Sequence, residues 1–92
     1  MTIHIRSATK EDVPIVAELI RGLARYEKLE NEVVMTEDLL AAGLFGGRPY
    51  AEVVLAVDEH RPVGFALFFH NFSTFLGRPG IYLEDLFVVP EE

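Results

Sequence analysis

The sequence predicts a single α/β domain in which one strand and two helices precede three antiparallel strands. Ile3 and Ile5 alternate with polar residues near the start, which is typical of a strand. Apolar residues between Val13 and Ala24 recur in steps of three and four, which indicates a helix with one buried face. From Glu52 onward, β-branched and aromatic runs are separated by compact turns. At 92 residues the chain has room for one domain.

Composition and charge exclude several classes of protein. Half the residues are hydrophobic and a quarter are charged, as in an ordinary globular domain. The net charge of −7 and the scattered Lys and Arg residues argue against nucleic-acid binding. No apolar run reaches about 18 residues, and Met1–Arg6 is no signal peptide, so we expect no membrane association. The absence of cysteine fits a reducing compartment, and we expect a cytoplasmic protein.

The first strand is predicted over Thr2–Arg6 and is followed by a helix with two candidate starts. Thr9 and Asp12 have the spacing of a capping box, which favours a start at Thr9. Pro14 favours Asp12 as the N-cap instead, and the sequence leaves both open. The helix loses its apolar stripe near Lys28. We expect it to pack on the sheet through one row of side chains, namely Val16, Leu19, Ile20 and Leu23.

A second, shorter helix is predicted over Thr36–Gly43. Thr36 is a suitable N-cap, and Glu37 and Asp38 place negative charge in the first turn. Gly43 is the residue expected just past the helix end.

Three strands are predicted to follow as an antiparallel meander. Glu52–Val57 and Pro62–Phe72 flank a polar turn, and Gly77–Gly80 is a second turn signal before Ile81–Val89. In the middle strand, small residues alternate with large ones, which indicates a close neighbour on the side of the small residues.

The last strand carries two adjacent carboxylates inside an apolar run. Strict alternation puts Glu84 and Asp85 on opposite faces. The expected faces are Tyr82, Glu84, Leu86 and Val88 against Leu83, Asp85, Phe87 and Val89. An unpaired buried carboxylate is costly, so such residues collect at catalytic and cation-binding sites.

Several segments together resemble the N-terminal half of the GCN5-related N-acetyltransferase (GNAT) superfamily. The resemblance is nearest to its diamine branch, the spermidine/spermine and thialysine acetyltransferases, and it covers essentially the whole chain. The segments that carry it are Leu23–Glu30, Val34–Leu40, Val63–Ala66 and, most specifically, Leu-Glu-Asp-Leu-Phe-Val at residues 83–88. The resemblance implies the GNAT acyl-CoA acyltransferase fold.

The resemblance also implies an activity and site residues. It implies transfer of acetyl from acetyl-CoA to a primary amine of a polyamine or a lysine-like small molecule, without a metal, in a homodimer. Glu84 corresponds to a glutamate that binds the amine and relays its proton. Tyr26 and Glu27 correspond to two residues that line the amine channel in this branch, and the family also has an acidic residue at the position of Asp85. The backbone of Leu86, Phe87 and Val88 corresponds to the strand that binds the pantetheine arm. From the residues alone, Asp85 is expected to pair with a cation or a backbone amide, and residues 86–88 to be core side chains.

The chain also differs from the family pattern. The family's pyrophosphate loop follows this strand, whereas the sequence ends at Glu92. We therefore expect residues 1–92 to be the N-terminal part of one acetyltransferase domain and to be inactive alone. There are two alternatives: a non-catalytic binding or structural module, and one part of a split enzyme. Two further sets of residues are expected to be structural. The histidines do not have the spacing of metal ligands, and the glycines do not follow a strand as those of a phosphate-binding loop do; these residues are His4, His60, His70, Gly43, Gly46 and Gly47.

Overall fold

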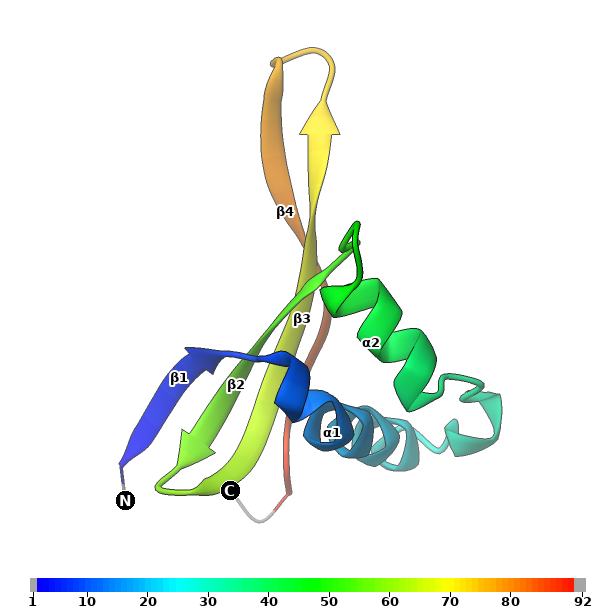
Figure 1. The fold of residues 1–92 in the computed structure, drawn as a ribbon, viewed down its shortest axis with the longest axis vertical. Coiled ribbons are helices and arrows are strands. Elements are labelled where there is room, and N and C mark those ends of the chain that lie inside the picture. The colour runs from blue at the N-terminus through cyan, green and yellow to red at the C-terminus, as the bar shows by residue number, and fades with distance from the viewer. Residues whose placement is uncertain (1, 91–92) are drawn as a thin grey trace.

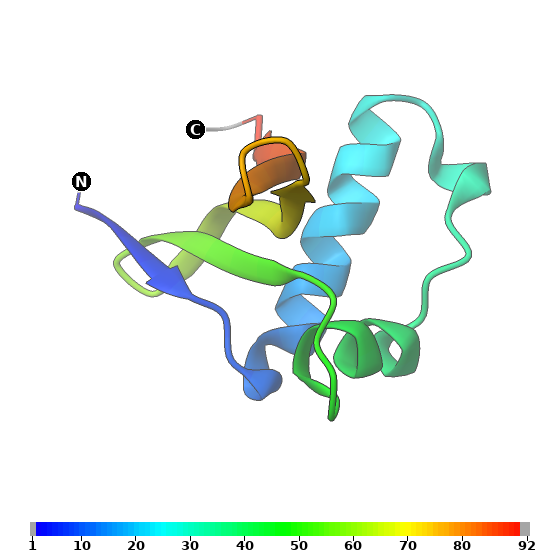
Figure 2. The ribbon, with the colours of Figure 1, turned by 90° about the horizontal axis from the view of Figure 1, so that it is seen from above.

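A four-stranded antiparallel sheet carries two helices on one of its faces (Figures 1 and 2). The computed structural model describes residues 2–90. The elements in chain order are β1 (Ile3–Ser7), the 3₁₀ turn η1 (Lys10–Asp12), α1 (Val13–Tyr26), the 3₁₀ turn η2 (Glu30–Glu32), α2 (Glu37–Phe45), β2 (Glu52–Asp58), β3 (Arg61–Ser73) and β4 (Arg78–Val88). The sheet order is β1-β2-β3-β4, so the predicted meander is confirmed and β1 extends it at one edge.

The core lies between the sheet and the two helices. Val16 of α1 and Leu55 of β2 are fully buried, and Leu19 is nearly so. Ile20 and Leu23 are partly buried and pack against the same cluster, which confirms the predicted helix face. In β2, buried residues alternate with half-exposed ones, as a sheet covered on one face requires.

Both candidate starts of the first helix are used. Thr9 precedes η1, and Asp12 precedes α1 with Pro14 in the first turn. Asp12 is the only buried charged residue among those described. Its carboxylate accepts hydrogen bonds from the Thr9 backbone N–H (2.7 Å) and from the two guanidinium nitrogens of Arg6 (2.7 and 3.0 Å). This network ties the end of β1 to the start of α1.

Two predicted boundaries are wrong. The second helix continues through Gly43 to Phe45, because Leu44 is buried in the core and keeps the helix turning toward it. Thr36 caps it as expected, accepting from the Leu39 N–H. The second turn signal is also misplaced, since β4 already begins at Arg78 and pairs with Ser73. Only Gly77 of that signal lies in the turn, with a φ of +68° that favours glycine.

The predicted faces of the last strand are also wrong in part. Leu67 pairs with Asp85 while the next residue, Phe68, pairs with Leu83, so Glu84 is the extra residue of a β-bulge. The bulge shifts the alternation by one. Tyr82, paired with Phe69, therefore shares a face with Asp85 rather than with Leu86.

The face of the sheet opposite the helices is open in the described part of the chain. Exposed apolar side chains lie along it, namely Ile5, Ile81, Leu83, Leu86 and Val88. Among residues 2–90, no helix has the length and apolar character needed to cross a membrane.

Candidate functional site

A groove forms where the last turn of α1 meets the second half of β4. It has a volume of about 540 Å³ and is lined by Leu23, Tyr26, Glu27, Leu86, Phe87, Val88 and Pro90. It therefore brings together five residues that the sequence had nominated from two distant segments. Leu23 and Pro90 were not nominated, and only the helix periodicity of Leu23 hinted that it faces β4.

Phe87 anchors the groove to the core. Its side chain is buried and contacts the ring of Tyr26 edge-on at 6.3 Å between centroids. On the helix, a Cβ at Gly22 would lie 3.3 Å from the Phe87 ring, so the absence of a side chain there lets β4 approach α1 closely. Tyr26 is itself largely exposed, so its far edge is available to a ligand.

The end of α1 is fixed by its backbone. The Glu27 N–H donates to the Leu23 carbonyl at 3.0 Å, and the Leu29 N–H donates to the Ala24 carbonyl at 2.8 Å. Lys28 between them takes a left-handed conformation with φ of 61°. The chain reverses there, which leaves Tyr26 and Glu27 at the helix end beside β4.

Glu27 lines this groove, and it interacts electrostatically with Asp85 of β4, as does the neighbouring Glu84. The pKa of Asp85 is raised, first because the side chain is partly buried and then because Glu84 and Glu27 place negative charge near it. Within residues 2–90, none of the three forms an ion pair, so the expected pairing of Asp85 with a cation or an amide is not found. A cluster of unpaired negative charge attracts cations.

The backbone of β4 offers hydrogen-bonding groups on its free side. The Val89 N–H donates to the Val63 carbonyl of β3 at 2.8 Å. Since backbone groups alternate in direction along a strand, Phe87 also points toward β3, whereas Leu86 and Val88 point to the open edge. The N–H and C=O groups of these two residues face no other strand in the described chain.

The side chains of residues 86–88 differ from expectation. Only Phe87 is core, while Leu86 is 65% exposed and Val88 53% exposed, because both lie on the open face of the sheet. Glu84 is exposed at the bulge. Among residues 2–90, no group of three or more metal-binding side chains is arranged to hold an ion.

The chain is similar in sequence to proteins that are named as N-acetyltransferases of small amines. The chain is 40% identical to a thialysine N-epsilon-acetyltransferase of Bos taurus over 97% of the chain. It is 29% identical to an L-ornithine N5-acetyltransferase of Arabidopsis thaliana over 92% of the chain. The chain spans 56% and 57% of these relatives, or about half of their length. No family model matches the chain.

Solved structures share the fold. A metagenomic aminoglycoside acetyltransferase superposes with a TM-score of 0.79 at 21% identity, over 97% of this chain and 57% of that one. A ribosomal-protein-alanine N-acetyltransferase of Brucella melitensis superposes with a TM-score of 0.76 at 18% identity, over 100% and 60%. In sequence, the chain therefore resembles about half the length of these amine acetyltransferases, and its fold is that of GCN5-related N-acetyltransferase structures over about 57–60% of their length.

Proposed function

We propose that the protein carrying residues 1–92 transfers an acetyl group from acetyl-CoA to a primary amine of a polyamine or a lysine-like small molecule. The observation that carries the proposal is the cluster of Glu27, Glu84 and Asp85 beside the open edge of β4. It is supported by the relatives, which are named as thialysine and ornithine acetyltransferases.

The acidic cluster suits a cationic acceptor. A primary amine has a pKa near ~10 and is protonated at neutral pH, so it enters as a cation and must lose a proton before it attacks. The pKa of Asp85 is raised first by partial burial and then by the negative charge of Glu84 and Glu27, and an ammonium group bound here would relieve the repulsion among the three carboxylates. Tyr26 and Glu27 form the wall of the groove on the helix side.

Glu84 is the proposed proton acceptor. Glu84 and Glu27 are exposed while Asp85 is partly buried, and Glu84 alone of the three lies at the bulge, where the strand changes the direction of its side chains. The bound ammonium gives one proton to Glu84, directly or through water, and the freed nitrogen then bonds to the thioester carbonyl carbon. The carbon–sulfur bond breaks, and the second proton of the nitrogen passes to the leaving thiolate, which departs as the thiol. Asp85 and Glu27 hold the remaining charges of the acceptor.

The open edge of β4 suits the donor. The unpaired backbone groups of Leu86 and Val88 fit an extended chain with amide groups, which they would bind as a neighbouring strand does. Bound there, acetyl-CoA supplies the activated acetyl group next to Glu84. Residues 1–92 are proposed to be the N-terminal part of one acetyltransferase domain, in a cytoplasmic homodimer.

An acceptor panel tests the proposal. The protein carrying residues 1–92 is incubated with acetyl-CoA and spermidine, thialysine, ornithine or a neutral alcohol of similar length. Thiol release and the mass of the product are followed. Release that requires an amine and yields the N-acetylated product is expected. Equal release with the alcohol, or none with any amine, would contradict the proposal and favour the non-catalytic module.

A further inference from the structure

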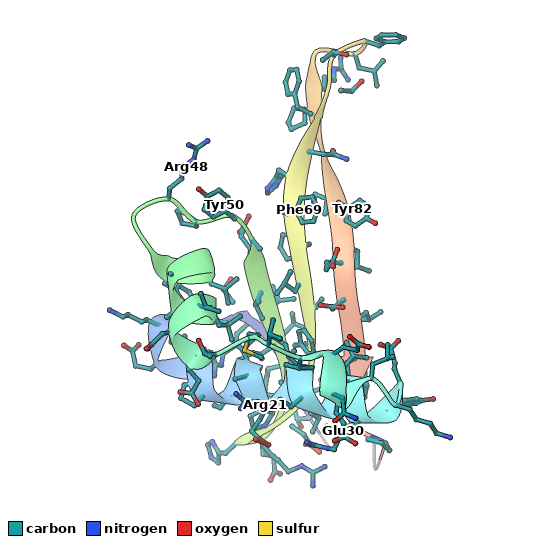
Figure 3. The ribbon with its side chains drawn as sticks, turned by 90° about the vertical axis from the view of Figure 1, so that its right-hand side faces the viewer. Arg21, Glu30, Arg48, Tyr50, Phe69 and Tyr82 are labelled. Carbon is teal, nitrogen blue, oxygen red and sulfur yellow. The ribbon has the colours of Figure 1, made fainter. Side chains whose placement is uncertain are left out.

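A stacked pair of aromatic rings lies on the β3–β4 hairpin. The ring of Tyr82 stacks on that of Phe69, with 5.0 Å between the centroids and 24° between the planes. Figure 3 shows the two residues beside each other on the hairpin, above α1 in that view. Phe69 covers one face of the Tyr82 ring. Since Tyr82 is 51% exposed, the other face of its ring is open to a ligand.

The β-bulge at Glu84 brings Tyr82 onto the same face of the sheet as Asp85. Asp85 pairs with Leu67, and Tyr82 pairs with Phe69, which is two residues further along β3. Side chains two residues apart on a strand point to one face, so both pairs share a face and lie roughly 7 Å apart along the strand. Without the bulge, the three-residue step from Tyr82 to Asp85 would put these two side chains on opposite faces.

The charges near this face favour a cation over an anion. Glu27 and Glu84 both interact electrostatically with Asp85. Among residues 2–90, those that line the groove beside this cluster include no Lys or Arg, and Arg25 lines an adjoining pocket instead. A carboxylate on the acceptor would therefore meet negative charge. A second ammonium group would meet an attractive field and the open face of the Tyr82 ring.

We propose that Tyr82 binds a second ammonium group of the acceptor and thereby selects linear diamines over amines that carry a carboxylate. The inference rests on the proposed acetyl transfer and names its acceptor class. The reacting amine lies among Glu27, Glu84 and Asp85. The second ammonium lies on the open face of the Tyr82 ring, within the field of Asp85. Four methylenes separate two nitrogens by roughly 6 Å, which matches the spacing of about 7 Å between the two strand positions.

Three acceptors of one chain length test the proposal in the protein carrying residues 1–92. After the same four methylenes, 1,4-diaminobutane, 1-aminopentane and 5-aminopentanoate place an ammonium, a methyl and a carboxylate group. The kcat/KM for each acceptor is measured at saturating acetyl-CoA. The wild-type protein is expected to prefer the diamine to aminopentane, and to use aminopentanoate least.

Substitutions of Tyr82 assign the preference to its ring. Tyr82→Leu removes the ring and should lower the ratio of kcat/KM for the diamine to that for aminopentane by roughly 3–10-fold. Tyr82→Phe keeps the ring and should keep the ratio. Ile81→Ala is the matched control and should also keep it, because Ile81 is the adjacent residue of β4, lies on the opposite face and is 66% exposed.

The ratio is measured within each variant, so a change in the amount of folded protein cancels. If Tyr82→Leu does not fold, Tyr82→Met takes its place, because a flexible apolar side chain can still contact Phe69. The inference is overturned by a wild-type protein that uses the diamine and aminopentane equally well, by an unchanged ratio without the ring, or by an equal loss in Tyr82→Phe. Acetylation of none of the three amines would instead overturn the proposed acetyl transfer, and the inference with it.

Discussion

Replacing Asp12 with asparagine should destabilise the domain by about 2–3 kcal/mol. The carboxylate accepts two hydrogen bonds from Arg6 and two from Thr9, through its backbone N–H and its hydroxyl. Asparagine offers one acceptor oxygen and turns an amide N–H₂ toward donors. The Arg6 guanidinium is accessible to water, so most of the loss comes from the bonds within the turn.

The assay is thermal and urea unfolding of the 92-residue chain. A domain of this size has a stability of about 5–14 kcal/mol, so the loss is a sizeable fraction, and the midpoint should fall by roughly 10–20 °C. Asp38→Asn is the control, since Asp38 is an exposed acid in the first turn of α2 and should change stability by less than about 0.5 kcal/mol.

The pH dependence separates charge from shape. The Arg6 guanidinium and the hydrogen bonds from Thr9 hold the pKa of Asp12 far below its usual value. A carboxyl with a lowered pKa stabilises the folded state above its unfolded pKa of about 4, and this stabilisation is lost as the pH falls further. The difference between wild type and Asp12→Asn should therefore shrink below about pH 4. A difference of less than 0.5 kcal/mol at pH 7, or one that does not shrink in acid, would refute the reasoning.

Three further predictions concern other parts of the domain. Gly64→Ala should destabilise by about 1–3 kcal/mol, because a Cβ there would lie 2.7 Å from the Phe87 carbonyl oxygen, and unchanged urea unfolding would contradict this. Gly43→Ala should instead stabilise by about 0.5–1 kcal/mol, because Gly43 is helical with no atom within 4 Å of its Cβ position, and a lowered midpoint would contradict this. Asp85→Asn should raise stability at pH 7, because the raised pKa of Asp85 means that its charged carboxylate is less stable in the folded chain than in the unfolded chain, and asparagine carries no charge. The gain should vanish below about pH 4, where the carboxyl is protonated in both states, and a loss of stability at pH 7 would contradict the raised pKa.

The sequence predicted the element order because its periodicities are local. The buried row of α1 follows from side-chain direction in a helix and is confirmed. In β3, burial does not alternate at Val63, Gly64 and Phe65, and the side of Gly64 and Ala66, where a close neighbour was expected, is the open face of the sheet in the described chain. The Thr36 cap is confirmed for the same reason, since its hydrogen bond spans only three residues.

The bulge in β4 and the length of the β3–β4 hairpin could not be predicted in this way. The bulge at Glu84 is a property of the pairing between β3 and β4, which no pattern within β4 records. Pro79 and Gly80 usually mark turns, yet both lie in β4. Pro79 is tolerated because β4 is an edge strand and its backbone at that residue points away from β3.

The candidate site was nominated by resemblance and then located by tertiary contacts. The sequence named Tyr26, Glu27 and residues 84–88, but it placed Glu84 and Asp85 on opposite faces without contact to the helix. In the structure, the negative charges of Glu27 and Glu84 both contribute to the raised pKa of Asp85, after its partial burial. Glu27 comes near Asp85 because α1 and β4 approach each other closely at Gly22.

The most direct test of the account is the steady-state kinetics of Glu84→Gln in the protein carrying residues 1–92. The substitution keeps the shape and removes the charge, so kcat/KM for the amine should fall about 10²–10⁴-fold while acetyl-CoA binding stays nearly unchanged. Glu11→Gln is the matched control, because Glu11 is an exposed acid in η1, outside the groove, and should keep wild-type kinetics. Wild-type kinetics for Glu84→Gln would remove Glu84 from the mechanism and contradict the account.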